Sequence, residues 1–485
     1  MSELVQGALA LVVIGLLVIA LVAPAAPLRA LRAASRLAGV AAVGALAAIS
    51  VAPADSFTRT SLLLLVLAAT LACAVLAFSV RHMRGDRHLD AYARGVVLLA
   101  AATLLGAGTD DMVVFAAAWL AASRIVVELI AQTAAPEQAT RAAASARGSF
   151  RLGDAALVIT VLLAALACAD SGFAALANAD AAAAPFLQAA AAALLVAIVV
   201  RSAALPAQRW LLASTAAPTP VCALLHAGFV NAGGIAALKF APLLTAAPLA
   251  LFALLAGGIA AILGGTAIGL VRADVKGRLA GSTVAQMGYM LVQCGLGAFA
   301  HALFHILAHG VFKAHAFLRA NGEIGVAGNA ASTPARGTEW LMLLPSLLFF
   351  AAWGLTDLAL ADLVLLSFAA TLGIEALSLA WRRGCLPQGV LRALAVTIPA
   401  LLAAVVVHHL LPTVVAAPLP IAPSAHLLGA MLGVLSILAY LRAARVALPD
   451  ALHAALLRLA NAHPPQRARL APLPLATLRA ARRSS

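Results

Sequence analysis

The sequence predicts an all-α polytopic membrane protein, and three observations carry that prediction. Of the 485 residues, 64% are hydrophobic and only 10% are charged, and the mean hydropathy is +1.04. These values lie far outside the range of a soluble multidomain protein. Apolar stretches of about 15 to 27 residues recur along the whole chain, and a helix needs roughly 20 residues to cross the hydrocarbon. Basic residues collect in every second connection between these stretches.

We expect about fifteen transmembrane helices, with 14 to 16 as the range, followed by a C-terminal tail. Residues 1–95 hold the N-terminal helices, 96–445 a transmembrane core and 446–485 a basic tail. The predicted spans are approximately 4–22, 37–51, 61–80, 92–108, 112–131, 152–169, 184–212, 220–240, 245–271, 279–298, 300–318, 341–355, 358–381, 390–411 and 426–441.

The formal net charge of +14 follows membrane topology and does not indicate nucleic-acid binding. Arginine and lysine follow spans one, three, five, nine and thirteen, whereas the connections between carry little basic charge. This positive-inside pattern predicts an outside N-terminus and a cytoplasmic C-terminus. The basic residues concerned include Arg29, Arg32, Arg36, Arg81, Arg84, Arg87, Arg94, Arg141, Arg147, Arg151, Arg272, Lys276, Arg278, Arg382, Arg383 and Arg392.

Catalytic chemistry and cofactors are not expected in this chain. The five cysteines lie singly, without CxxC or paired spacing, so no iron–sulfur or zinc site is predicted. The sizeable aqueous segments are 319–340 and the tail after Pro449, and neither is long enough to bury a domain core. Soluble machinery must therefore come from another subunit. The tail could dock such a subunit, lie on membrane lipid headgroups or remain solvated.

A column of ionisable side chains stands out within an otherwise apolar span. His301, His305, His309 and Lys313 are spaced four residues apart, so they stack along one stripe of a helix. A titratable group at mid-bilayer costs on the order of 2.5 to 3.5 kcal/mol, so four together must face protein or a wet path. This stripe predicts a route for protons or another ion.

The same spacing would let three imidazoles share a zinc ion, which leaves a metal site as the alternative. Lys313 would repel a cation, and the sequence places no carboxylate nearby to support the ligands. Histidines near their intrinsic pKa pass protons at physiological pH, so the relay is the preferred interpretation and no metal is expected in this chain.

The seventh span is predicted to be broken. Pro206 follows Arg201 closely, and a proline inside a helix removes a backbone donor and clashes one turn back. Broken helices at membrane depth commonly mark ion sites in transporters. The alternative is a helix that ends at the membrane interface with Arg201 extended toward the headgroups.

Two neighbouring spans add ionisable groups. His226, in span eight, could relay protons or serve as a structural hydrogen-bond donor. Lys239, near the other end of that span, is interpreted as an interfacial anchor. On span five, Arg124 and Glu128 are four apart and could form an ion pair, or Glu128 could exchange its partner for a proton.

Two runs of residues carry a family resemblance over about Val96 to Ala320. The first comprises Arg201, Leu205, Pro206, Trp210, Pro218, Thr219, Pro220, Leu225, His226 and Ala227. The second comprises Asp274, Val275, Lys276, Leu279, Ala280, Ser282, Thr283, Gln286, Met287, Gly288, Tyr289 and Met290, followed by His305, His309, Phe312 and Lys313. Together they resemble the antiporter-like subunits of respiratory complex I and of multisubunit sodium/proton antiporters. The resemblance implies a proton-conducting core with inverted repeats.

The chain departs from that family at three places. The family has a glutamate directly after the tryptophan of span five, whereas Leu120 follows Trp119 here. It has a lysine where this chain has Arg201, and arginine does not readily release its proton. No lysine occurs in predicted spans twelve to fourteen. These departures argue against complex I pumping of the usual kind.

The run from His226 to Gly234 and the short chain are similar to the membrane subunit of DAB-type inorganic carbon transporters. That resemblance implies a non-enzymatic subunit of the bacterial inner membrane, and a large soluble partner with a zinc site similar to β-carbonic anhydrase. Our leading hypothesis is a proton path through Glu128, Arg201, His226, His301, His305, His309 and Lys313 that drives carbon uptake. The alternatives are a subunit of an Mrp-type cation/proton antiporter or of a complex I-like NADH–quinone oxidoreductase.

Overall fold

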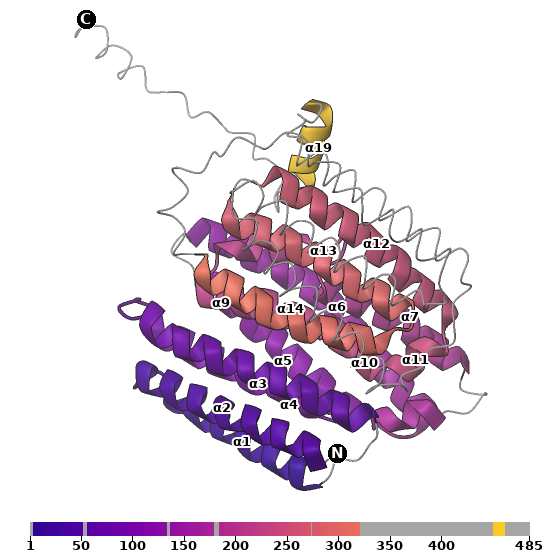
Figure 1. Cartoon of the computed structure of the whole chain (residues 1–485), viewed down its shortest axis with the longest axis horizontal. Coiled ribbons are helices and arrows are strands. Elements are labelled where there is room, and N and C mark those ends of the chain that lie inside the picture. Colours follow the sequence, from indigo (N-terminus) through magenta and orange to yellow (C-terminus); the bar gives the residue numbers. More distant parts are fainter. Residues whose placement is uncertain are drawn as a thin grey trace, which may run out of the picture.

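The computed structural model describes residues 3–51, 56–132, 136–178, 184–272, 274–320 and 450–460 (Figure 1). In these residues the chain is helical, with one isolated β-bridge between Asp111 and Gly172. Nine helical segments of this part are long and apolar enough to cross a membrane. The prediction of an all-helical, multi-pass membrane protein is therefore confirmed, whereas predicted spans twelve to fifteen, and with them the total of fifteen, lie outside the described residues.

The first eleven predicted spans each correspond to a helix or to a broken pair of helices. Two helices begin ten or more residues earlier than predicted, α2 at Pro27 and α6 at Pro136, because proline is well suited to a first helical position and alanine-rich segments tolerate arginine within a helix. The main helices are α1 (Glu3–Val22), α2 (Pro27–Val51), α3 (Ser56–His82), α4 (Leu89–Gly108), α5 (Met112–Ala131), α6 (Pro136–Cys168), α7 (Ala184–Arg201), α12 (Pro248–Val271), α13 (Val275–Gly295) and α14 (Phe299–Arg319).

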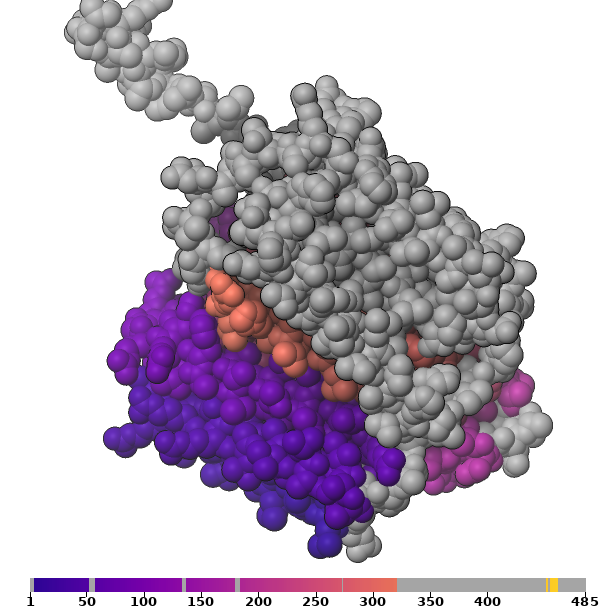
Figure 2. Space-filling view, in the orientation of Figure 1, coloured from indigo at the N-terminus to yellow at the C-terminus, as the bar shows by residue number. Residues whose placement is uncertain are grey.

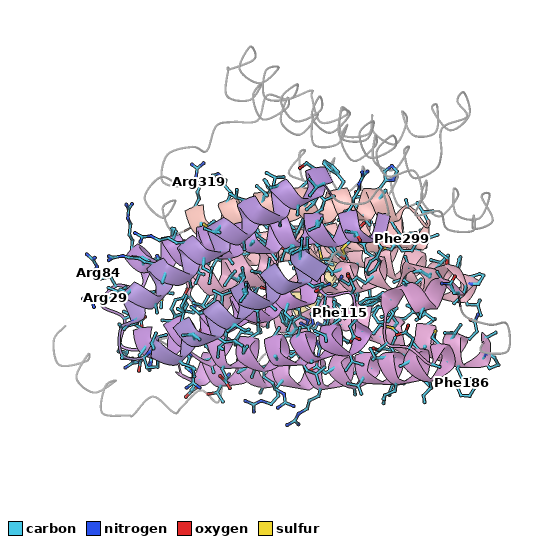
Figure 3. The ribbon with its side chains drawn as sticks, turned by 90° about the horizontal axis from the view of Figure 1, so that it is seen from below. Arg29, Arg84, Phe115, Phe186, Phe299 and Arg319 are labelled. Atoms are coloured by element: carbon cyan, nitrogen blue, oxygen red, sulfur yellow. The ribbon has the colours of Figure 1, made fainter. Side chains whose placement is uncertain are left out.

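Successive helices run in alternate directions, so the basic connections gather at one end of the bundle. Figure 3 shows Arg29, Arg84 and Arg319 at that end, and Phe186 and Phe299 at the opposite end. The helices α1 to α4 form a continuous block on one side of the molecule, with part of α14 beside it (Figure 2). Which end faces the cytoplasm stays a prediction.

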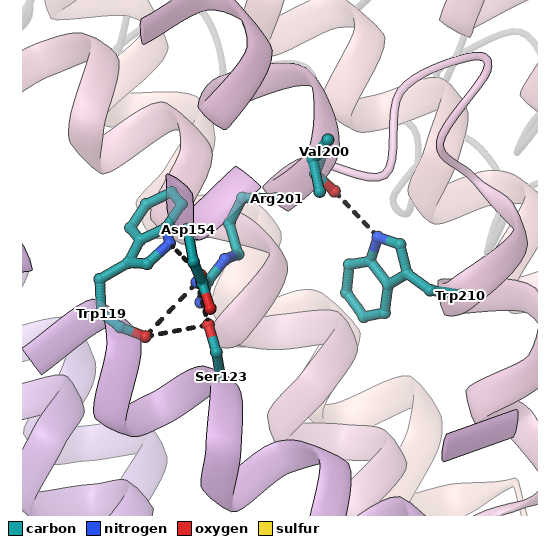
Figure 4. Close-up of polar contacts among 6 residues, drawn as sticks. All are labelled: Trp119, Ser123, Asp154, Val200, Arg201 and Trp210. Atoms are coloured by element: carbon teal, nitrogen blue, oxygen red, sulfur yellow. Dashed lines mark hydrogen bonds and ion pairs between the residues drawn. The ribbon is translucent and has the colours of Figure 1, made fainter. Parts of the chain in front are cut away.

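The predicted break after Arg201 is confirmed. The chain turns through Ala203, whose φ of 50° lies in the left-handed region, and resumes as α8 (Arg209–Ala213) and the short 3-10 turn η3 (Ser214–Ala216). At the break the carbonyl of Val200 accepts two hydrogen bonds, one from the Ala203 N–H at 3.2 Å and one from the Trp210 indole N–H at 2.9 Å (Figure 4).

A second break, which the sequence analysis did not predict, divides span eight. The span is divided into α9 (Thr219–Ala227) and α10 (Ala232–Lys239) by the 3-10 turn η4 (Phe229–Asn231). The short helix α11 (Ala241–Thr245) follows α10. Gly233 allows this element to approach α7, because a Cβ atom there would lie 2.1 Å from Ser202 Oγ and 2.9 Å from the Ile198 carbonyl oxygen. The two breaks therefore lie against each other.

At the basic end, α13 begins directly after Asp274. Its carboxylate accepts the Gly277 N–H at 2.7 Å and pairs with Arg272 at 2.8 Å. Partial burial raises the pKa of this carboxyl, but the bonds from Arg272 and Gly277 outweigh burial and hold the pKa below its usual value. The resulting negative charge caps the positive end of the α13 dipole. A further helix, α19 (Asp450–Ala460), packs its Ala460 against Ile268 and Ala280.

Candidate functional site

The first group of buried polar residues is the arginine centre, formed by Arg201, Asp154, Ser123 and Trp119 (Figure 4). Arg201, the last residue of α7, is only 2% exposed. Its Nη2 atom lies 3.3 Å from Asp154 Oδ1 and 2.6 Å from Ser123 Oγ. The ion pair therefore joins α7 to α6, and Ser123 holds both to α5.

The Asp154 carboxylate is held by three donors on one oxygen atom. Oδ1 accepts the Ser123 hydroxyl at 2.8 Å and the Trp119 indole N–H at 3.0 Å, in addition to the Arg201 guanidinium. The guanidinium also lies over aromatic rings, 3.7 Å from the Trp119 ring centroid and 4.1 Å from that of Phe229. A planar, weakly hydrated cation suits such a site, because the rings replace part of its lost hydration.

Asp154 was not among the site residues predicted from the sequence. The available signal was its position, since it is the one acidic residue of the predicted span 152–169, and a lone carboxylate in a membrane span is a functional candidate by default. The sequence motif pointed instead to position 120, where leucine follows Trp119 in place of the glutamate of the family. In the structure a carboxylate does reach this centre, but it comes from α6 and not from position 120 of α5.

The predicted Arg124–Glu128 pair is not formed. In the described part of the chain both side chains are exposed on α5, and neither takes part in an ion pair. The neighbouring Ser123 faces inward and is 1% exposed. The structure thus brings Arg201 together with Ser123 and Asp154, and leaves Glu128 on the outside of the same helix.

The second group is the histidine–lysine centre, formed by His226, His305, His309 and Lys313. The last three lie on α14 and are 8%, 4% and 0% exposed, and His226 on α9 is 0% exposed. His301, one turn earlier on α14, is 8% exposed. The stripe therefore faces the protein interior and not lipid, as a route for ions requires, while its use as a route stays a prediction.

Helix α13 supplies most of the partners of this stripe, and α9 supplies one backbone carbonyl. His309 Nδ1 lies 2.7 Å from Gln286 Oε1, and its Nε2 lies 3.0 Å from the His226 carbonyl oxygen. Lys313 Nζ donates to Ser282 Oγ at 3.0 Å and to the Leu279 carbonyl at 3.1 Å. These partners are all neutral.

The remaining contacts tie α9 to the same centre. His226 Nδ1 lies 3.2 Å from Thr283 Oγ1, and its ring stacks on Phe317 with the centroids 4.2 Å apart. The rings of His305 and His309 also stack, at 5.9 Å. Across the described residues, no group of three or more His, Cys, Asp or Glu side chains is arranged to hold a metal ion.

His309 occupies a site that suits both of its protonation states. The His226 carbonyl can only accept, so the His309 Nε2 atom must carry a proton. A glutamine amide presents an oxygen that accepts and an NH2 that donates, so rotation of Gln286 satisfies either a neutral or a protonated Nδ1. Both ring nitrogens of His309 therefore have a hydrogen-bond partner in either protonation state.

A third buried cation lies where α10 meets α3 and α4. Lys239 is 1% exposed, and its Nζ donates to Ser61 Oγ at 3.1 Å and to the Thr109 carbonyl at 2.8 Å. The rings of Phe57 and Phe173 lie 5.2 and 5.3 Å from Nζ. The interpretation of Lys239 as an interfacial anchor is therefore wrong, because the side chain ends in a closed polar and aromatic site.

One broken element contacts all three groups. The segment α9–η4–α10 places His226 in the histidine–lysine centre, Phe229 against Arg201, and Lys239 at its far end. Beside it lies a mainly apolar cavity of about 80 Å³, in which Thr103, Arg201 and Asn231 are the polar lining residues. A cavity of this size is large enough to hold water molecules.

Buried charged side chains on broken transmembrane helices are typical of ion-transporting membrane subunits. Residues 109–337, just under half of the chain, match the protein family described as the transmembrane domain of NADH:quinone oxidoreductase and Mrp antiporters, and this part of the chain is similar to that family. The resemblance predicted from the sequence is thus confirmed.

Relatives of two kinds are similar to this chain, inorganic carbon transporter subunits and a subunit of NADH-quinone oxidoreductase. The probable inorganic carbon transporter subunit DabB of Bacillus subtilis is 42% identical over 132 residues, which cover 27% of this chain and 26% of that protein. DabB1 of Halothiobacillus neapolitanus is 33% identical over 254 residues, covering 51% and 45%. NADH-quinone oxidoreductase subunit L of Mycobacterium tuberculosis is 31% identical over 251 residues, covering 51% and 40%. The matched regions span less than half of each relative.

Two solved structures share the fold. The Mrp complex from Dietzia sp. aligns with a TM-score of 0.64 at 21% identity, over 99% of this chain and 59% of the matched chain. The archaeal membrane-bound sulfane sulfur reductase aligns with a TM-score of 0.60 at 17% identity, over 94% and 98%. At these identities the comparison establishes an antiporter-like fold.

Proposed function

We propose that this chain is the membrane subunit of an energy-coupled inorganic carbon uptake complex, and that it conducts protons or another cation to drive a soluble partner. The partner we propose is a large zinc protein similar to β-carbonic anhydrase, bound at the cytoplasmic face of a bacterial inner membrane with the N-terminus of this chain outside. The names of the DabB relatives support the carbon substrate. The buried ion pair between Arg201 and Asp154 supports the coupling.

In this proposal Asp154 is the group that changes charge at the arginine centre. Arginine keeps its proton throughout the physiological range, so Arg201 supplies a fixed positive charge. Protonation of Asp154 would cancel the partner charge and leave Arg201 with neutral partners, which are Ser123, the Trp119 carbonyl and the aromatic rings. Because an unpaired buried charge is costly, that step would favour either deprotonation or movement of the broken end of α7.

The histidine–lysine centre would act as the relay. A proton on His309 would pass to His305, whose ring stacks on it, or to Lys313, which lies one turn further along α14, while Gln286 holds the His309 ring in place. One charge that crosses 100 mV releases about 2.3 kcal/mol, which is enough to shift a protein equilibrium by roughly fiftyfold. The segment α9–η4–α10 contacts both centres, so it is the element through which their charge states would influence each other.

The test is growth of a bacterial strain that lacks carbonic anhydrase in ambient air, with this chain expressed together with the soluble protein encoded beside its gene. We expect rescue only when both proteins are present, and copurification of a complex whose zinc resides in the soluble subunit. A complex that forms but does not rescue growth, or rescue that persists in a strain whose proton gradient is collapsed, would overturn the proposal.

A second function is favoured by one observation, the similarity to NADH-quinone oxidoreductase subunit L and to the Mrp fold. In that case the chain would be a proton-translocating subunit of an antiporter or redox complex. Copurification with several small membrane subunits, together with sodium-dependent proton exchange in vesicles, would support that function. Copurification with a single large zinc protein would exclude it.

A further inference from the structure

Four arginines surround a recess at the basic end of α2 and α3, away from the buried centres. Arg32 and Arg36 come from the first turns of α2, and Arg81 and Arg84 from the end of α3 and the turn that follows. We call this site the arginine recess. It has a volume of about 550 Å³, and Ala77 and Val80 also line it.

The recess carries positive charge without a compensating acid in its lining. All four arginines are exposed, and the remaining polar lining residue, Ser35, donates its hydroxyl to the Cys73 carbonyl at 2.9 Å. Asp86, in the connection after α3, is engaged with the His88 N–H at 2.7 Å. Guanidinium groups present forked donors that match phosphate oxygens in pairs. The lining therefore has the chemistry of a phosphate or phosphodiester site.

The surfaces that continue from the recess are apolar. On α2, the exposed stripe of Arg32 and Arg36 continues through Val40 and Val43, which are 67% and 69% exposed. On α3, the stripe of Arg81 continues through Ala77 and Ala74, which are also exposed. Each helix thus carries arginines at its basic end and small or branched apolar residues along the same face toward the membrane centre.

We propose that the arginine recess binds the headgroup of an anionic phospholipid, whose acyl chains lie along the exposed faces of α2 and α3. Basic pockets between transmembrane helices are suited to such headgroups. A free anion would use the arginines but not the two apolar faces. An acidic soluble protein would likewise leave those faces, which extend to membrane depth, without a partner. The proposal does not depend on the function proposed above.

The test measures lipid binding by the full-length chain, purified in mild detergent and stripped of lipid. Native mass spectrometry and thermal unfolding would be followed on addition of phosphatidylglycerol, phosphatidylcholine or inorganic phosphate. The informative variant is Arg36→Gln with Arg84→Gln. The matched control is Arg147→Gln with Arg151→Gln, which removes the same charge from exposed positions on α6.

We expect phosphatidylglycerol to bind and raise the unfolding temperature of the wild-type chain, with no comparable effect of phosphatidylcholine or inorganic phosphate. The recess variant should weaken phosphatidylglycerol binding on the order of tenfold or more, and the control variant by less than about twofold. Equal weakening in both variants would indicate diffuse electrostatic attraction and overturn the proposal. An equal response to inorganic phosphate, or loss of a copurifying acidic protein with unchanged lipid binding, would also overturn it.

Discussion

The arginine centre and the histidine–lysine centre solve the problem of buried charge in different ways. Arg201 is paired with a carboxylate, and its neighbours Ser123 and Trp119 bind that same carboxylate. Lys313 and His309 are held instead by a hydroxyl, an amide and backbone carbonyls. In the arginine centre an opposite charge neutralises the buried cation. In the histidine–lysine centre neutral hydrogen-bonding groups take the place of water around it.

This difference in hydrogen-bond and charge partners favours a different role for each centre. A balanced pair is sensitive to the loss of either member, because the remaining charge is buried without compensation. A set of neutral partners tolerates both charge states, because hydroxyl and amide groups can donate or accept. We therefore infer that the arginine centre acts as a switch between two conformations, and that the histidine–lysine centre acts as a path for protons.

The largest expected effect comes from Asp154→Asn, which leaves Arg201 charged and unpaired. We expect uptake to fall to background and the free energy of unfolding to fall by about 3 kcal/mol, the typical cost of breaking a buried pair. Transport in cells or vesicles and thermal unfolding of the purified chain would measure the two effects.

The double variant Arg201→Met with Asp154→Leu provides the control for that experiment. An apolar pair of similar volume should recover stability to within about 1 kcal/mol of wild type. Uptake should stay at background, because neither residue can then carry charge. If the double variant transports normally, the arginine centre is a structural ion pair and the proposed switch is wrong.

The second largest expected effect is a difference in uptake between variants of a buried and of an exposed histidine on α14. His309→Gln keeps a polar side chain beside Gln286 but removes the titratable ring, so uptake should fall by about a hundredfold, as expected when a positioned proton-transfer group is lost. His315 lies on the exposed face of the same helix and provides a matched control. His315→Gln should transport as wild type, and equal loss in both variants would remove the argument for a path along the buried stripe.

Lys239 should show a smaller and graded effect. Lys239→Met removes the cation and leaves the Thr109 carbonyl and the Ser61 hydroxyl without their donor, at a stability cost of about 1 to 3 kcal/mol. Lys239→Arg keeps the charge and should lose less. If uptake follows stability in both variants, Lys239 only holds α10 against α3 and α4. If uptake falls severalfold in a methionine variant that stays folded, Lys239 belongs to the ion path.

The sequence was sufficient for the helical membrane fold, because hydropathy and the alternation of basic connections are properties of single segments. It also predicted the break after Arg201, since Pro206 has a direct effect on its own helix. The break between Ala227 and Ala232 has no such marker. It depends on Gly233 meeting Ser202 across two helices, and contacts between distant segments leave no local pattern.

The same reasoning explains which site residues were found. The stripe on α14 has a regular spacing that marks one face, and the structure buries that face. The partner of Arg201 could not be chosen by spacing, because Asp154 lies 47 residues away on another helix. Glu128 was favoured because Arg124 is one turn away on the same helix. Sequence proximity therefore selected an exposed pair, and the tertiary fold selected Asp154.

The smallest expected effect is that of Glu128→Gln, which tests the contrast between the exposed Glu128 and the partly buried Asp154. Glu128→Gln removes an exposed carboxylate that makes no ion pair among the described residues, so stability should change by no more than about 0.5 kcal/mol, as for other surface substitutions. Uptake should remain at least half that of wild type, whereas Asp154→Asn abolishes it under the same assay. Should Glu128→Gln abolish uptake while Asp154→Asn transports, the carboxylate of the switch lies on α5, and the ion pair with Arg201 serves only to hold α6 and α7 together.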